Sequence, residues 1–202
     1  MSTGTLRLKR LQYPNGTNAL SIDSDGSLST GTLAVTGNTT VSGTLVNTGL
    51  ITASGGVAIG GTDAAHTLDD YEEGTWTPTV IGNGGNSGQA YSSQQGTYTK
   101  IGRQVDCRFY LILSTEGSFS GSYLRLDGFP FTISTAVQTV HLCNMYFVGL
   151  ADNYISLGLQ AYENTTSAFI WGKTSASGSR EYLGTGDLAD NVNLSGAFTY
   201  FV

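Results

Sequence analysis

The sequence predicts an all-β protein in two parts, an N-terminal trimeric shaft of β-helical or β-spiral type followed by a C-terminal jelly-roll-like β-sandwich. Three observations predict this class. Charged residues form only 12% of the chain while Thr, Val, Tyr and Phe are plentiful, which favours strands over helices. Glycine recurs every six residues in one uncharged stretch. About eight strand-like runs separated by turn residues then follow.

Charge and glycine spacing divide the chain of 202 residues into four segments. The third is acidic and has room for one helical turn, capped by Thr62 and stopped by Gly74. The expected segments are a basic N-terminal segment at 1–27, the glycine-periodic β shaft at 28–62, a short neck at 63–73 and the β-sandwich head at 74–202.

The shaft is predicted from five consecutive repeats, GTLAVT, GNTTVS, GTLVNT, GLITAS and GGVAIG, which begin at Gly31. An even period places the third and fifth residues of every repeat on one face of a strand. One repeat is too small to cover that apolar face, but three chains wound about a common axis can cover it. The expected shaft core is Leu33, Val35, Val41, Leu45, Ile51, Val57 and Ile59.

Two other structures compete for the repeats. A left-handed β-helix of the acyltransferase type would have fewer than two coils from five repeats. A flexible Gly/Ser/Thr linker would not place Val, Ile and Leu in phase. Both stay open beside the trimeric shaft.

The head is predicted from period-two alternation. Val105, Cys107 and Phe109 share one strand face with Leu111 and Leu113. Turn-rich segments at 82–88 and 175–178 separate the strands. The expected strands are 75–81, 96–101, 105–113, 122–126, 139–150, 154–161, 167–171 and 192–202, a number that fits a jelly-roll-like sandwich.

The composition disfavours nucleic acid and membranes as partners. A net charge of −6 with nine Lys and Arg residues disfavours nucleic acid, whose phosphates require many cations. No apolar run approaches the roughly 18 residues that a membrane helix needs, so we expect no membrane insertion. Cys107 and Cys143 lie far apart and in no CxxC pair, and both are expected to be small core residues.

Three stretches of the head resemble a C-terminal module common in bacteriophage tail-fibre and minor structural proteins: LDDYEEGTWTPTV at 68–80, GTYTKIGRQV at 96–105 and LRLDGFPFT at 124–132. LAVTGNTTVSGTLVNTG at 33–49 likewise looks like a phage fibre-shaft repeat. The resemblance implies a homotrimeric virion appendage that is made in the bacterial host cytoplasm. It also implies that segment 1–27, with Arg7, Lys9 and Arg10, anchors the fibre on another virion protein.

The sequence offers little for catalysis, metal or cofactor binding. Its only dense carboxylates, at 69–73, lie in the neck with no evident burial to raise a pKa. His66 and His141 are far apart, and no GxSxG elbow accompanies them. Asp23-Ser-Asp25-Gly26 lacks the Glu that closes a calcium loop, so a turn is expected. We therefore expect no enzyme, no metal and no cofactor.

Aromatic residues are the candidates for receptor binding. Tyr and Trp present flat apolar faces with a polar handle, which suits stacking on sugar rings. Tyr162, Trp171 and Tyr182 border polar segments at 163–167 and 175–179 and are the candidate receptor-binding residues. The expected function is a tail fibre whose head contacts a host surface glycan or receptor. A head-attached or decorative capsid fibre is the alternative, and a glycan-degrading tailspike is a weaker one.

Overall fold

The computed structural model describes residues 21–22, 28–29, 35–135 and 141–202, and the chain divides into two units, Met1–Ile51 and Thr52–Val202. In the first unit β1 (Ser21–Ile22) pairs antiparallel with β2 (Leu28–Ser29). Residues 35–51 form no strand or helix, and all their side chains are exposed. The anchor residues Arg7, Lys9 and Arg10, and Leu33 of the shaft, lie outside the described residues.

The second unit starts with a small hairpin. In it β3 (Val57–Ala58) pairs antiparallel with β4 (Thr67–Leu68), and the 3-10 helix η1 (Ala64–His66) lies between them. Asp63 is the N-cap of this helix and Thr67 its C-cap. A single helical turn is therefore present in the predicted neck. Its N-cap is Asp63 rather than the expected Thr62, and it ends at its C-cap Thr67, well before the expected stop at Gly74.

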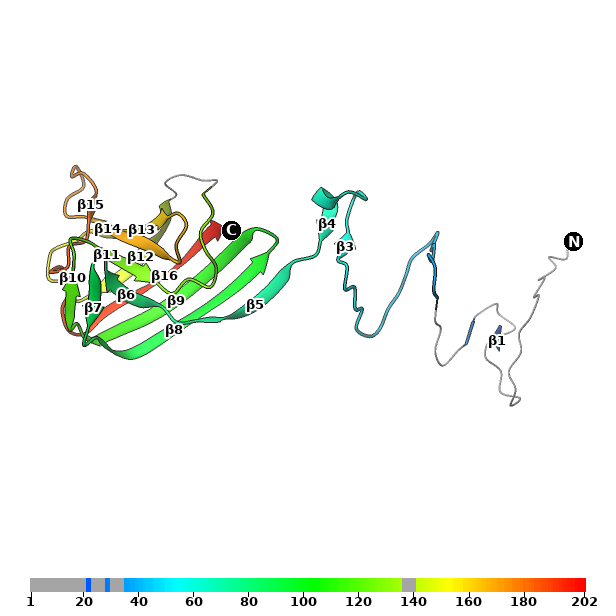
Figure 1. Cartoon of the computed structure of the whole chain (residues 1–202), viewed down its shortest axis with the longest axis horizontal. Coiled ribbons are helices and arrows are strands. Elements are labelled where there is room, and N and C mark those ends of the chain that lie inside the picture. Colours follow the sequence, from blue (N-terminus) through cyan, green and yellow to red (C-terminus); the bar gives the residue numbers. More distant parts are fainter. Residues whose placement is uncertain (1–20, 23–27, 30–34, 136–140) are drawn as a thin grey trace, which may run out of the picture. The chain divides into compact units, whose positions relative to one another are not determined.

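The rest of the second unit is one curled antiparallel β-sheet, so the all-β class is confirmed (Figure 1). Neighbouring strands follow the order β5-β8-β9-β16-β12-β13-β14-β11-β6, with β15 added beside β14. Two further strands, β7 and β10, pair with each other. The bounds are β5 Tyr71–Trp76, β6 Thr79–Gly82, β7 Gly85–Ser87, β8 Ala90–Ile101, β9 Gln104–Thr115, β10 Ser118–Ser120, β11 Leu124–Asp127, β12 His141–Val148, β13 Ser156–Tyr162, β14 Ser167–Lys173, β15 Glu181–Tyr182 and β16 Val192–Phe201.

Two features curl this sheet into a sandwich-like fold. The edge strands β5 and β6 are consecutive in sequence and are separated only by Thr77 and Pro78, so one stretch of chain borders both ends of the sheet. Proline lacks the N–H that a ladder needs, which suits it to this corner. Strand β12 is shared, because Tyr146–Val148 pair with β16 while the part from His141 to Met145 pairs with β13. We call β5, β8, β9 and β16 the first half-sheet, and β13, β14, β11 and β6 the second.

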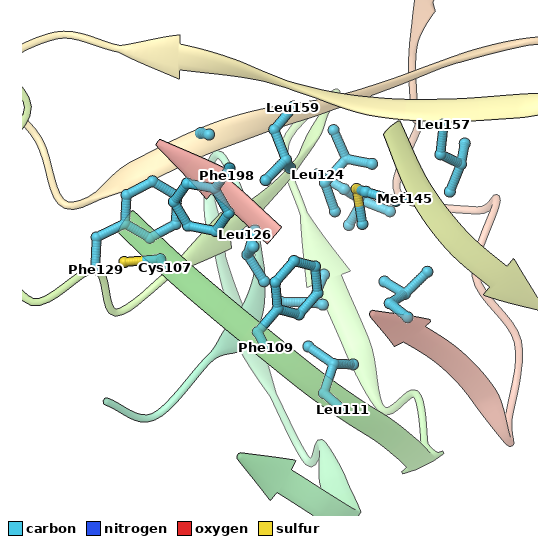
Figure 2. Packing of buried hydrophobic residues seen from close by; sticks show 14 of the residues in the cluster. Cys107, Phe109, Leu111, Leu124, Leu126, Phe129, Met145, Leu157, Leu159 and Phe198 are labelled. Atoms are coloured by element: carbon cyan, nitrogen blue, oxygen red, sulfur yellow. The ribbon is translucent and has the colours of Figure 1, made fainter. Parts of the chain in front are cut away.

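The two half-sheets enclose one hydrophobic core (Figure 2). Phe109 and Leu111 from β9 belong to the same cluster as Leu124 and Leu159 of the second half-sheet, and Cys107 lies beside Phe129. Cys107 is fully buried, as expected, and burial raises its pKa to about 12. The side chain of Cys143 is not among those described.

An aromatic cluster lies at the centre of the core. The Trp76 ring is 5.6 Å from Phe129, 6.0 Å from Phe198 and 6.2 Å from Phe109, measured between centroids. Such edge-to-face pairs add to the free energy that burial of their area already provides. Trp76 Nε1 donates to the carbonyl oxygens of Thr97 and Arg108, so the polar atom of this buried ring is satisfied.

The expected strands coincide with observed ones, but several bounds differ: β8 begins at Ala90 rather than at residue 96, and the predicted neck contains β4 and the first three residues of β5. The run predicted over 75–81 is two strands, β5 and β6, because Pro78 interrupts it. The short strands β7, β10 and β15 were not predicted. In the described parts of the chain, no helix is long and apolar enough to cross a membrane.

Candidate functional site

The outer face of the second half-sheet carries the most distinctive group of exposed side chains. Strand β14 alternates, with Ala168 and Ile170 buried in the core and Phe169 and Trp171 on the opposite face. Successive strand residues point to opposite faces of a sheet, so this alternation places both rings on the outside. Leu126 is likewise inside on β11, while Arg125 is outside and opposite Phe169.

Aromatic rings form a continuous cluster on that face. Phe169 lies 5.0 Å from Tyr162 and 5.0 Å from Tyr182, between ring centroids. Tyr123 completes the cluster at 5.3 Å from Tyr182 and 6.5 Å from Phe169. Trp171 is the register partner of Tyr182. Together with Arg125 and Arg180, these residues form a surface that we call the aromatic–arginine face: Tyr123, Arg125, Tyr162, Phe169, Trp171, Arg180 and Tyr182.

Both arginines stack on rings of this face. The Arg125 guanidinium lies 5.4 Å from the Tyr162 centroid and 6.0 Å from that of Phe169. The Arg180 guanidinium lies 5.9 Å from Trp171 and 5.9 Å from Tyr182. Cation–π contacts of this kind are worth about 0.5–1 kcal/mol where they are exposed. These contacts place the two guanidinium groups beside flat apolar ring surfaces.

The β13–β14 hairpin positions Tyr162 and Phe169. Its turn contains Asn164, whose φ of 59° lies in the left-handed region that asparagine tolerates better than most residues. The Thr165 hydroxyl donates to the carbonyl of Tyr162 at 2.5 Å and closes the turn. The hairpin register then places Tyr162 opposite Ser167 and Gln160 opposite Phe169.

Polar contacts hold Tyr182 and Arg125 in place. The Tyr182 hydroxyl donates to Gln160 Oε1 at 2.8 Å, across β14. The backbone N–H of Leu183 donates to Ile170 O at 2.9 Å, which attaches the chain after β15 to β14. Arg125 Nη1 donates to Ser167 Oγ at 3.3 Å. Most of the face is therefore preorganised on strands, with Tyr123 and Arg180 directly before β11 and β15.

The segment after β15 is fixed by a half-buried tyrosine, Tyr154. The Tyr154 hydroxyl donates to Asp187 Oδ2 at 2.7 Å, and the same oxygen accepts the N–H of Gly184 at 2.7 Å. Burial and the hydrogen bond to Asp187 both raise the pKa of Tyr154. The Tyr154 ring packs on Gly172, where a Cβ atom would lie 2.3 Å from the ring. Glycine is needed there for close approach to β14.

Besides the aromatic–arginine face, a polar hollow lies on the outer face of the first half-sheet. It measures about 390 Å³, and its charged lining residues are Glu73, Asp106 and Arg108. A smaller hollow of about 200 Å³ shares Thr97 and Arg108 with it. The two acids and one base give this surface mixed charge.

The carboxylates of the predicted neck have structural partners. Asp70 pairs with the buried Lys100, and Glu72 accepts the Tyr98 hydroxyl. Glu73 accepts the hydroxyl of Tyr71. In the same region His66 and Asp63 lie 2.5 Å apart, between Nδ1 and Oδ1. These contacts engage three of the four carboxylates at 69–73, namely Asp70, Glu72 and Glu73.

The structure brings the three predicted receptor-binding residues together on one face. Tyr162 is exposed, and Trp171 and Tyr182 are half-buried. Phe169 could have been found from the alternation SAFIWGK, in which Phe169 and Trp171 are two residues apart. Arg125 could not, because it enters the face from a strand more than forty residues away in sequence.

No protein-family model matches the chain, and none of the curated proteins matches it. Among the described residues, no group of three or more His, Cys, Asp or Glu side chains is placed to hold a metal ion.

Proposed function

We propose that this chain is a homotrimeric structural fibre protein of a bacteriophage virion, whose jelly-roll-like head binds a bacterial surface glycan through the aromatic–arginine face. The observation that carries the binding role is the convergence of Tyr123, Tyr162, Trp171 and Tyr182 with two arginines on one sheet face. This convergence supports a tail fibre over an enzyme. The assignment to a virion rests on the resemblance of the sequence motifs to phage fibre proteins.

Binding would proceed by stacking and hydrogen bonding. Sugar rings have apolar C–H faces that pack on Tyr and Trp, and hydroxyls around their edges. On the aromatic–arginine face the hydroxyl of Tyr162 and the guanidinium of Arg125 lie beside such apolar surface. Because the strands fix these groups, little side-chain entropy is lost on binding.

The shaft residues support assembly from several chains. Val35, Val41, Leu45, Ile51, Val57 and Ile59 are between 49% and 71% exposed in one chain. All other side chains of 35–51 are exposed as well, Val46 at 79% and Leu50 at 92% among them, so the support for assembly comes from the six-residue period, which places the apolar side chains on one face. Three copies of the head on one shaft would raise weak binding by avidity, often by about a hundredfold or more.

The function is tested by competition with the full-length protein. Purified chain is added to host bacteria before phage, and adsorption is counted; we expect adsorption to fall with the wild-type chain. A double variant, Tyr162→Ala with Tyr182→Ala, should compete much less. Tyr146→Ala is the matched control, because Tyr146 is an exposed tyrosine of β12 outside the aromatic–arginine face.

Two results would contradict the proposal. If the wild-type chain binds no host envelope fraction and leaves adsorption unchanged, a decorative capsid fibre becomes the better account. If the double variant and Tyr146→Ala compete equally well with the wild type, the head binds its receptor elsewhere. A loss of polysaccharide chain length on incubation with the purified chain would instead favour a tailspike enzyme.

A further inference from the structure

One end of the first half-sheet carries a row of exposed apolar side chains. Tyr71 is the register partner of Ile101, Ile101 of Gln104, and Gln104 of Phe201, so the four residues cross β5, β8, β9 and β16 in one line. Directly opposed residues share a sheet face. Tyr71 is 59% exposed, Ile101 51% and Phe201 43%. We call Tyr71, Ile101 and Phe201 the apolar row.

The apolar row contrasts with its neighbours on the same face. The next register line across the four strands is Glu73, Thr99, Asp106 and Thr199, and the one after it is Thr75, Thr97, Arg108 and Ala197. Isolated apolar residues on a surface are ordinary, but three in register at one end indicate a contact surface.

The backbone around the row is firmly held. Gly102, in the turn between β8 and β9, donates its N–H to Asp70 O at 2.7 Å. The C-terminal Val202 donates to Arg103 O at 2.9 Å and accepts from Arg103 Nε at 3.1 Å. The row is therefore part of an ordered platform that includes the β8–β9 turn and the last strand.

Chain length ties this platform to the end of the shaft. Val57, one of the last two shaft residues, pairs directly with Leu68 in the β3–β4 hairpin, and Tyr71 follows Leu68 by three residues. Three residues span at most about 10 Å. If three copies meet around Val57, their three Tyr71 residues must begin close to the same axis.

We propose that the apolar row is a contact between heads and that its occupant is the same row of the other copies of this chain. The proposal rests on the proposed trimeric fibre and adds the surface through which its heads meet. The contact would bury Tyr71, Ile101 and Phe201 around the axis where the shaft ends, and it would leave the aromatic–arginine face uncovered.

Hydroxyl-radical footprinting of the full-length protein tests the contact. Tyr71 and Tyr146 are each 59% exposed in one chain, and Tyr146 lies on β12, which adds to the opposite side of β16, so it is a matched reference. We expect Tyr71 to be oxidised several-fold more slowly than Tyr146. Light scattering on the same sample gives the oligomeric state. A trimer in which Tyr71 and Tyr146 react equally fast overturns the contact alone, whereas a monomer at micromolar concentration overturns both the contact and the fibre.

A charge variant provides the second measurement. Ile101→Asp would place like charges around the axis, and oxidation of Tyr71 should then rise to the rate of Tyr146. Ile155→Asp is the control, because Ile155 is 57% exposed and lies outside the row. Both side chains are exposed in the single chain, so neither change removes a core contact. Unchanged protection of Tyr71 in Ile101→Asp would refute the proposed contact.

Discussion

The packing of Trp76 on Gly96 can be tested by a double-mutant cycle. Gly96 is the register partner of Trp76, and a Cβ atom at position 96 would lie 2.6 Å from Trp76 Nε1. Gly96→Ala should therefore overpack this site and lower the free energy of unfolding by about 1–3 kcal/mol. Trp76→Ala removes a ring that is 7% exposed and should lower it by about 3–5 kcal/mol.

The double variant should lower the free energy of unfolding by less than the sum of the losses in Gly96→Ala and Trp76→Ala. Once the indole is absent, the methyl group added by Gly96→Ala meets no ring, and alanine in a strand interior is better than glycine by about 0.5–1 kcal/mol. We expect a coupling energy of about 1–3 kcal/mol in favour of the double variant, measured by urea unfolding followed by circular dichroism. The chain concentration is held fixed, because association shifts apparent stability.

Trp76→Phe separates packing from hydrogen bonding. It keeps an aromatic ring beside Phe129 but loses the N–H that Thr97 O and Arg108 O accept, so a loss of about 2 kcal/mol is expected. If the cycle is additive within about 0.5 kcal/mol, the indole does not lie on Gly96, and the packing argument is refuted.

Three further predictions concern the rest of the head. Because burial raises the pKa of Cys107 from 9.0 to about 12, the native state should lose stability as pH rises above 9, by up to about 1.4 kcal/mol per pH unit until the native thiol ionises. Urea titrations from pH 8 to 11 should show that the free energy of unfolding falls less steeply with pH in Cys107→Ala than in the wild type. Gly128→Ala, at a φ of 90° and with its Cβ 2.3 Å from Thr77 O, should cost about 1–3 kcal/mol, whereas Gly186→Ala, which meets no atom within 4 Å, should be near neutral in the same assay. Arg125→Lys keeps the charge but loses the planar stack on Tyr162, and envelope binding by the purified chain should weaken more than in Arg103→Lys.

The sequence predicts the strands of the head well because most of them are half-buried. Val105, Cys107 and Phe109 alternate with outward residues, and that period determines both the strand and its buried face. The errors have local causes. Pro78 divides one expected strand, and β15 has only two residues, too few for a period to be visible. The order of the strands could not be predicted, because pairs such as β11 with β14 join distant segments.

The candidate site was predicted in part. Tyr162, Trp171 and Tyr182 border polar segments of the sequence, and strand register brings them to one face. Their partners Arg125 and Tyr123 depend on the pairing of β11 with β14, which no local pattern contains.

The arrangement of the head allows assembly and binding to occur together. Both half-sheets turn their inner residues, such as Leu111 and Leu159, towards one core, so their outer faces point in different directions. The apolar row lies on the first half-sheet and the aromatic–arginine face on the second. Contacts around the axis through Ile101 would therefore not cover Tyr162. A single small sheet that is curled at β12 thus has room for both the proposed contact between copies and the proposed glycan site, on separate outer faces.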